Sequence, residues 1–271
     1  MLIDMHLHTR RSKDSSLSFP DAIVEAKRLG LDAICVTEHG RFTSEAEAME
    51  MMARFEFTVL GGVEFSTALG HFLVYDVPST VSWSLEREAL LRRLRALEAE
   101  IQREQSITLH RLESRLTRMM DFEIADLVRL VHQAGGVIVW AHPMDDRSPL
   151  RQQFNVFAET EGTTEVAEFV RWLGENDVTQ GWLSVIHALD GFEILNGSAR
   201  RRGIGSVLAT QIAEAFGKPG TAGSDAHRVE SVGRVATRFA AAPGNGIRIG
   251  ELLRSGAPRV EVLKPLGDGS W

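Results

Sequence analysis

The sequence has a single cysteine, no long apolar run and no excess of positive charge. Because Cys35 stands alone, no intrachain disulfide can form, and its apolar neighbours predict a small buried hydrophobe. No apolar run approaches the roughly 20 residues that cross a bilayer. The first residues also lack the basic region, apolar stretch and cleavage site of a signal peptide. These absences predict a soluble, cytoplasmic protein with no membrane partner.

The charge balance limits the class of partner. The chain carries 30 Lys and Arg against 37 Asp and Glu, for a formal net charge of -7. Non-specific binding to duplex DNA needs clustered cationic side chains, so we do not expect duplex DNA as a partner. A small phosphorylated substrate is compatible with this charge, because bound metal ions would neutralise its phosphate. The sequence does not indicate an oligomeric state.

Strands and helices alternate along most of the chain, which predicts an α/β fold with a parallel sheet or barrel. No repeat, low-complexity tract or clear linker appears, so we predict one domain over residues 1–271. Strands are expected at 2–8, 33–39, 57–66, 71–77, 137–140, 191–196, 235–240 and 259–263. Helices are expected from the capping residue Ser18 to Gly30, from Asp121 to about 134, and at 44–54, 164–174, 204–216 and 248–254. The polar stretch 145–163 is predicted as a loop.

A further helix, predicted at residues 84–105, is amphipathic. Leu90, Leu94, Leu97 and Ile101 recur at the spacing of one helix face. Such a stripe usually packs on its own domain, so we expect it to be buried there. The segment that follows, 106–120, is polar and basic. Residues 80–120 together are candidates for a helical lid or insertion.

Imidazoles and carboxylates close or follow the apolar runs predicted as strands. Nine residues do so: His6, His8, Asp14, His39, Glu64, His71, His142, Asp225 and His227. At strand ends they can converge in one pocket, where a mixed nitrogen and oxygen set suits two or three divalent metals. His6 and His8 are two residues apart, so on a strand both imidazoles point to the same face. The first hypothesis is therefore a metallohydrolase.

Each of these residues has an ordinary interpretation when taken alone. Asp14 lies in a polar loop, His71 follows Gly70 as a turn residue would, and His142 precedes Pro143, which favours an extended backbone. The joint pattern is the stronger indication, because it includes most of the histidines. The remaining ones, His110, His132 and His187, are expected to be structural or solvated.

The motifs IDMHLHT, VTEHG, GVEFS, GHFLVYDV, VIVWAHP, DGFEILNG and GSDAH resemble, in this order, those of the PHP (polymerase and histidinol phosphatase) superfamily. The resemblance runs over residues 2–240 and includes every ligand position. It implies a distorted, TIM-like (β/α)7 barrel of parallel strands with a metal cluster at the C-terminal ends of the strands, as in related barrels. It also implies a metal-dependent phosphoesterase that uses zinc, manganese or iron.

The resemblance also distributes the ligands among metals. His6, His8, Glu64 and Asp225 would hold one ion, and Glu64 would bridge to a second held by His71 and His142. Asp14, His39 and His227 would bind a third, and catalysis would depend on Glu64, Asp225 and His227. The implied reaction is phosphoester hydrolysis by in-line attack of water, with the metals lowering its pKa and neutralising the phosphoryl oxygens.

Arginines near the motifs are candidates for contacts with the substrate phosphate. These are Arg147, which follows the His142 motif, and Arg200, Arg201, Arg202 and Arg228. Arg11 and Lys13 are also close in sequence to ligands. For each of them, a solvated surface charge is the alternative.

Three other functions stay open. A histidinol-phosphate phosphatase of this family typically has histidine at the position of Asp14, so the aspartate favours enzymes acting on nucleotides and similar monoesters. An exonuclease on short oligonucleotides would need stacking aromatics, for which Trp83, Trp140, Trp172 and Trp182 are candidates. A metal-stabilised sensor or interaction module would use the helix at 84–105 to bind a partner, but the complete ligand set argues against it.

Overall fold

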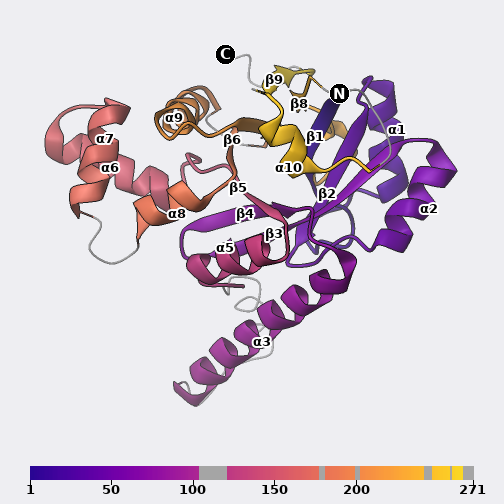
Figure 1. Cartoon of the computed structure of the whole chain (residues 1–271), viewed down its shortest axis with the longest axis horizontal. Helices are drawn as coiled ribbons and strands as arrows, with labels where there is room; N and C mark the ends of the chain where they lie inside the picture. Colours follow the sequence, from indigo (N-terminus) through magenta and orange to yellow (C-terminus); the bar gives the residue numbers. More distant parts are fainter. Residues whose placement is uncertain (104–120, 177–180, 199–201, 241–245, 257, 265–271) are drawn as a thin grey trace.

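The computed structural model describes residues 1–103, 121–176, 181–198, 202–240, 246–256 and 258–264 (Figure 1). The strands are β1 (Leu2–Leu7), β2 (Ala33–His39), β3 (Thr58–Thr67), β4 (Gly70–Tyr75), β5 (Val137–Trp140), β6 (Gly191–Asn196), β7 (Gly220–Gly223), β8 (Val235–Arg238) and β9 (Arg259–Val262). They form one sheet in the order β7-β6-β5-β4-β3-β2-β1-β8-β9.

The sheet curls into a nearly closed barrel, because the end of β7 returns to the side of β1. The backbone N–H of Asp225 donates to the carbonyl of His6 over 2.7 Å, and that of His8 donates to Ala226 over 2.9 Å. A β-carbon at Gly223 would lie only 2.3 Å from the β-carbon of His6. Only glycine therefore allows β7 to approach β1 this closely.

The barrel expected from the sequence is present, but its strands are not all parallel. β8 is antiparallel to its neighbour β1, and β4 also runs against its neighbours. β1, β2 and β3 are parallel, and so are β5, β6 and β7. β4 is antiparallel to both β3 and β5. Only two residues separate β3 from β4, and a parallel pair would need a crossover of a dozen or more.

Helices cover the outside of the barrel. They are α1 (Phe19–Arg28), α2 (Glu45–Phe55), α3 (Ser79–Arg103), α5 (Ile124–Gln133), α6 (Pro149–Glu161), α7 (Val166–Asn176), α8 (Trp182–Ala188), α9 (Arg202–Ala215) and α10 (Ile249–Arg254). A 3-10 turn, η1, spans Val229–Ser231. None of the helices in the described residues is both long and apolar enough to cross a membrane.

The hydrophobic core has parts on both sides of the barrel wall. Inside, Ile3, Met5, Cys35, Leu73 and Val139 pack together, and α10 closes the end opposite the strand C-termini with Ile249, Leu252 and Leu253. Cys35 is fully buried, as predicted. Outside, α1 and α2 pack on β1 and β2, while α5 to α9 pack on β4 to β6. All strands of the described residues thus belong to one sheet. The division of the chain into domains stays a prediction.

Two local predictions are wrong. The stretch 145–163 contains helix α6 rather than only a loop, because Leu150, Phe154 and Phe157 recur at helical spacing and are buried. Asp121 does not cap α5, whose N-cap is Glu123. The Asp121 carboxylate instead accepts the backbone N–H of Ser66 over 2.8 Å and forms an ion pair with Arg93.

The amphipathic helix is present as α3, but its leucine stripe is not buried where predicted. α3 extends away from the barrel (Figure 1) and contacts it through Leu85 and Ala89. Leu90 is 56% exposed and Leu94 47% exposed among the described residues. Both lie on a helix face that the barrel does not reach. Residues 104–120 of the candidate lid lie outside the described residues.

Candidate functional site

All nine predicted ligands meet at one end of the barrel, which we call the barrel mouth. His6 and His8 lie at the end of β1, His39 ends β2, and Glu64 is its register partner in β3. His142, Asp225 and His227 directly follow β5 and β7, and Asp14 lies in the loop after β1. His71 reaches the same end because β4 runs antiparallel, so its first residues lie where the other strands finish.

Glu64 lies at the centre of the cluster, and its two oxygens face different imidazoles. Oε1 is 2.9 Å from Nδ1 of His71 and 3.3 Å from Nε2 of His142. Oε2 is 2.9 Å from Nδ1 of His39 and 3.3 Å from Nε2 of His8. The carboxylate is almost fully buried. A carboxylate in this position can contact two cations at once, one through each oxygen.

Three sets of residues bring potential ligand atoms together, and within each set these atoms lie within 4.8 Å of one another. They are His6, His8 and Asp225; Glu64, His71 and His142; and His8, His39 and His227. The second is the set implied by the family resemblance, and the first is the implied set without Glu64. In the third set, His8 lies beside His39 and His227. His8 therefore belongs to both the first set and the third. The described chain thus offers three candidate places for a divalent ion, two of which share His8. Nitrogen with carboxylate oxygen suits zinc, manganese or iron.

Asp14 joins the third set from the solvent side. Its Oδ2 is 3.2 Å from Nε2 of His39 and 3.3 Å from Nε2 of His227, although the side chain is 58% exposed. Nδ1 of His227 donates to the carbonyl of Asp225 over 3.0 Å, if its proton resides there. This bond would leave Nε2 of His227 free to ligate an ion.

The carboxylates and imidazoles of the barrel mouth shift one another's pKa values. Burial alone would raise the pKa of Glu64, but the imidazoles of His71, His6 and His39 outweigh it and hold this pKa well below the usual value. Burial opposes protonation of His39 and His142, yet Glu64 and the other nearby carboxylates raise their pKa values to about 10 and about 9. Without metal, protonated histidines supply the positive charge that balances these carboxylates.

We therefore expect metal binding to release protons. With pKa values of about 9 and 10, His142 and His39 are protonated at neutral pH and must lose these protons to become ligands. Apparent zinc affinity should rise about tenfold per pH unit for each proton released between pH 6 and 8. Calorimetric titration of chelator-stripped protein with zinc, in two buffers of different ionisation enthalpy, measures the release.

The control for this titration is His132→Gln. His132 pairs with Asp190 on the outside of the barrel, 3.0 Å apart, and is remote from the ligand sets. The variant should release as many protons as the wild type. Equal heats in both buffers for the wild type would contradict the assignment of His39 and His142 as ligands.

The backbone is unusual at two candidate ligands, and at His142 it differs from the sequence-based expectation. Pro143 was expected to hold His142 extended, but His142 has a φ of 31°, and Asp225 has a φ of 51°. Non-glycine residues rarely adopt this left-handed region, and they persist there only when their surroundings hold them. For His142, the backbone N–H donates to Oε2 of Glu193 over 2.9 Å, which stabilises the unusual conformation.

Sequence reasoning did not identify three buried acids beneath the ligands: Asp4, Glu38 and Glu193. Asp4 accepts the N–H groups of Ser224 and Gly233, and burial raises its pKa to about 6. Glu38 accepts from the backbone and hydroxyl of Thr9. Each acid interrupts an apolar strand within two residues of a histidine or a strand end. An acidic residue inside such a run is the signal that could have identified them.

A cavity of about 420 Å³ opens beside the ligands. Its lining includes seven ligands together with Arg147, Ser148, Pro149, Asn196 and Ser198. Ser148 and Pro149 begin α6, but the Ser148 hydroxyl donates to the carbonyl of Pro143 over 2.5 Å instead of capping the helix. The N-terminal N–H groups of α6 therefore add positive potential beside the Arg147 guanidinium.

The other candidate cationic residues either do not line this cavity or lie outside the described residues. Arg228 is exposed but does not line this cavity. Arg11 pairs with Glu47 over 2.6 Å, and Lys13 is exposed. Arg200, Arg201 and the Arg202 side chain lie outside the described residues, as does His110. His132 and His187 lie away from the barrel mouth, and the ring of His187 packs on Phe216.

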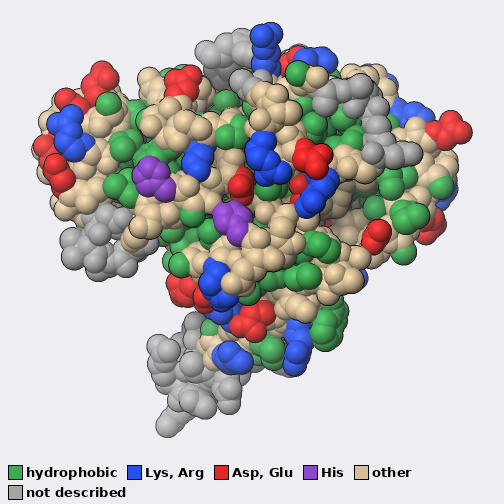
Figure 2. Space-filling model, viewed as in Figure 1, with side chains coloured by type: hydrophobic (Ala, Val, Ile, Leu, Met, Phe, Trp, Pro, Cys, Tyr) green, Lys and Arg blue, Asp and Glu red, His purple; other side chains and the backbone are tan. Residues whose placement is uncertain are grey.

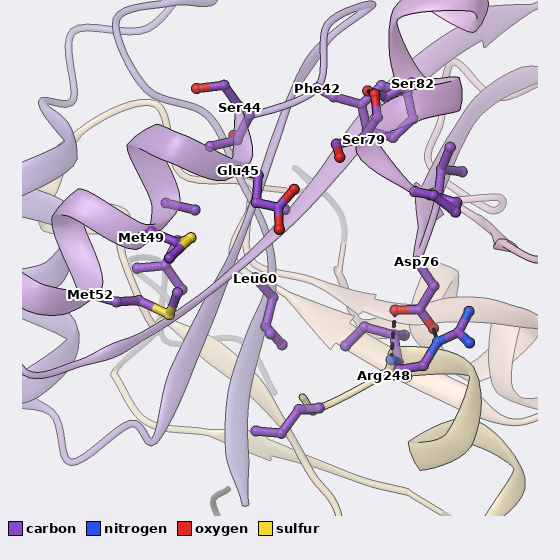
Figure 3. Close-up of a pocket in the computed structure, with 18 of the residues that line it drawn as sticks. Phe42, Ser44, Glu45, Met49, Met52, Leu60, Asp76, Ser79, Ser82 and Arg248 are labelled. Carbon is purple, nitrogen blue, oxygen red and sulfur yellow. Dashed lines mark hydrogen bonds and ion pairs between the residues drawn. The ribbon is translucent and has the colours of Figure 1, made fainter. Parts of the chain in front are cut away.

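A larger cavity, of about 910 Å³, lies elsewhere and contains none of the nine ligands (Figure 3). It runs between α2, the outer face of β3, the start of α3 and the start of α10. Its acids are mostly paired: Asp76 accepts the N–H groups of Ile249 and Gly250, and Glu86 accepts that of Phe42. Size alone would have selected this cavity, whereas the ligand chemistry selects the smaller one.

Comparison with solved structures supports the barrel. A protein from Bifidobacterium adolescentis assigned as a metal-dependent phosphoesterase is 18% identical, with a TM-score of 0.51 over 83% of this chain and 87% of its own. An amidohydrolase from Chromobacterium violaceum is 21% identical, with a TM-score of 0.54 over 85% and 89%. The lesion-specific endonuclease Q of Pyrococcus furiosus is 12% identical, with a TM-score of 0.54 over 96% and 57%. At these identities the likeness concerns the fold.

Comparison of sequences identifies the family. An uncharacterised protein of Methanocaldococcus jannaschii is 30% identical over 96 residues, which cover 30% of this chain and 56% of that relative. The chain thus matches just over half the length of this curated relative. The model of the PHP-associated region matches residues 207–255, and the PHP domain model matches residues 4–170, more than half of the chain. Together with the metal-ligand clusters, these matches support a metal-dependent hydrolase. The chain belongs to the PHP domain family.

Proposed function

We propose that this protein is a metal-dependent phosphoesterase that hydrolyses a small phosphorylated molecule, such as a nucleotide or a similar monoester. The observation that carries the proposal is the position of Glu64, with one oxygen toward each of two imidazole groups, beside a cavity lined by Arg147. Two or three zinc, manganese or iron ions fit the three ligand sets. The site residues are then the nine ligands and Arg147.

The chain's own side chains would orient the reactants. Bound divalent ions would supply an acidified water and would neutralise the phosphoryl oxygens. Glu64 and Asp225 hold the imidazoles in place, and the hydrogen bond from His227 to the Asp225 carbonyl keeps its other nitrogen available. The exposed Arg147 guanidinium, next to the uncapped start of α6, would bind the phosphate of the substrate.

The positions of the aromatic side chains, away from the barrel mouth, favour a small substrate over an oligonucleotide. Trp140 and Trp182 are buried in the core, and Trp172 packs on Phe157 and Phe169. Trp83 is exposed but lines the larger cavity on the outer face of β3. Among the described residues, the cavity at the barrel mouth has no aromatic lining other than histidine. Stacking of successive bases, which single-strand binding requires, therefore has no platform there.

Charge gives no support for a duplex substrate. On the face seen in Figure 2, Lys and Arg side chains are interspersed with Asp and Glu. Tracking a duplex backbone needs a continuous positive surface. Among the monoesters, Asp14 favours a general phosphoesterase over a histidinol-phosphate phosphatase, and its contacts with His39 and His227 place this aspartate within the cluster.

The proposal is tested by metal analysis combined with a substrate panel. Protein as purified should contain two to three equivalents of transition metal, and it should hydrolyse p-nitrophenyl phosphate or a nucleoside monophosphate. Chelation should abolish turnover, and zinc, manganese or iron should restore it. Faster release of mononucleotides from a labelled oligomer than phosphate from any monoester would favour the exonuclease. Metal-replete protein that is inert toward the panel would contradict both.

A further inference from the structure

Glu193 is a buried carboxylate directly behind two ligand sets, although it belongs to neither. It lies in the middle of β6, and its two oxygens accept three N–H groups. Oε1 is 3.0 Å from Nδ1 of His6. Oε2 is 2.9 Å from the backbone N of His142 and 2.9 Å from Nδ2 of Asn196. One side chain thus contacts a member of the His6–His8–Asp225 set and a member of the Glu64–His71–His142 set.

The contact with His6 determines which ring nitrogen can bind an ion. A neutral imidazole carries one proton, and an acceptor at Nδ1 keeps the proton on that atom. The free electron pair then lies on Nε2. This nitrogen is 3.0 Å from Nε2 of His8, 3.6 Å from Glu64 and 3.6 Å from Asp225. With the other tautomer, the electron pair of His6 would point at Glu193, away from the set.

The contact with His142 acts through the backbone. A φ of 31° is unfavourable for a residue with a side chain, and the bond from its N–H to Glu193 offsets part of this cost. In this conformation Nε2 of His142 lies 3.3 Å from Oε1 of Glu64. An extended backbone, as Pro143 would otherwise favour, would direct the imidazole elsewhere.

The neighbouring strand leaves room for this carboxylate. A β-carbon at Gly223 would lie 2.9 Å from Oε1 of Glu193, so a larger residue in β7 would displace the oxygen that reaches His6. The glycine that permits closure of the barrel therefore also permits the contact between Glu193 and His6.

We propose that Glu193 is a positioning residue that prepares both ligand sets together, by setting the tautomer of His6 and the backbone conformation of His142. This inference rests on the proposed function only in that the two sets hold metal. It requires no particular substrate. Removing Glu193 should therefore weaken both sets at once, although it ligates neither ion.

The first test uses the wild-type protein loaded with zinc, which is diamagnetic. Long-range nitrogen–proton NMR correlation on protein with labelled histidine should show His6 protonated at Nδ1 and coordinated through Nε2. Coordination through Nδ1 would overturn the proposal. This measurement involves no turnover, so it separates the role of Glu193 from the proposed phosphoesterase activity. Failure of the wild type to bind zinc at all would refute the proposed function instead.

The second test is Glu193→Gln, which keeps the size of the side chain. The amide oxygen can take only one of the two oxygen positions, so the amide NH₂ faces the donor or donors at the other position. We expect zinc affinity to fall about 10- to 100-fold in both sets, the range for groups that orient metal ligands. Competition with a zinc chelator measures it. Unchanged affinity and an unchanged His6 tautomer would overturn the proposal.

Asp190→Asn is a matched control. Like Glu193, Asp190 contacts a histidine and a backbone N–H. Its Oδ2 is 3.0 Å from Nε2 of His132 and accepts the backbone N–H of Ile138 over 2.9 Å. Neither partner belongs to a ligand set. The Asp190–His132 pair lies on the outside of the barrel, so Asp190→Asn should keep wild-type zinc affinity, whereas Glu193→Gln should lose it. A similar loss of zinc affinity in Asp190→Asn would reduce Glu193 to a general structural role.

Discussion

Glu64→Gln is expected to lose both metal and turnover. Glu64 presents one oxygen to His71 and His142 and the other to His39 and His8. Glutamine has a similar shape, but it is neutral and replaces one oxygen with an NH₂ donor, so one set loses its anionic ligand. Groups that only orient a ligand already contribute about 10- to 100-fold to metal affinity or activity. We expect a decrease of more than about 100-fold in both quantities.

Metal content by mass spectrometry and turnover of p-nitrophenyl phosphate test this expectation. Glu261→Gln is the control, because Glu261 pairs with Arg238 on the outside of the barrel and its loss should leave both quantities unchanged. Circular dichroism should show that the fold of Glu64→Gln is intact. A folded Glu64→Gln protein with wild-type metal content and turnover would mean that the carboxylate does not bridge ions.

Arg147→Met is expected to lose substrate affinity while metal content stays unchanged. Arg147 lines the cavity at the barrel mouth but belongs to none of the ligand sets. A hydrogen bond to a charged group contributes roughly 1.5–3 kcal/mol. Loss of the guanidinium should therefore lower kcat/KM by about 10- to 100-fold for a phosphate monoester.

The comparison variant for Arg147→Met is Arg171→Met, since Arg171 is exposed on α7 and does not line the cavity. Steady-state kinetics should show wild-type kcat/KM for Arg171→Met. An Arg147→Met enzyme with unchanged kcat/KM would leave phosphate recognition to the start of α6 or to other residues. A loss of metal in Arg147→Met would show instead that the substitution acts on the cluster.

The convergence of the nine candidate ligands could be predicted because its signal is local. An apolar strand that ends in a histidine or carboxylate brings that group to the sheet edge, and His6, His39 and His142 follow this pattern. His71 shows where the pattern is insufficient. It starts its strand, and it reaches the same edge only because the two-residue connection makes β4 antiparallel.

Features that depend on contacts between distant segments could not be predicted. Arg147 and Arg228 looked equivalent in the sequence, but only Arg147 lines the cavity. The leucines of α3 have the spacing of a buried face, yet Leu90 and Leu94 are exposed because the helix leaves the barrel. Glu193 lies between His6 and His142, which are separated from it by 187 and 51 positions.

The sequence by itself determined the candidate ligand types, their order and the alternation of strands and helices, because strand period and apolar runs act over a few residues. The barrel was implied by the resemblance to the PHP superfamily. The tertiary structure alone decided how the nine candidate ligands are grouped, which arginine lines the cavity beside them, and which buried acids contact them. These depend on the close approach of β7 to β1 at Gly223 and on the direction of β4. Such contacts join residues far apart in the chain, and no local pattern encodes their distances.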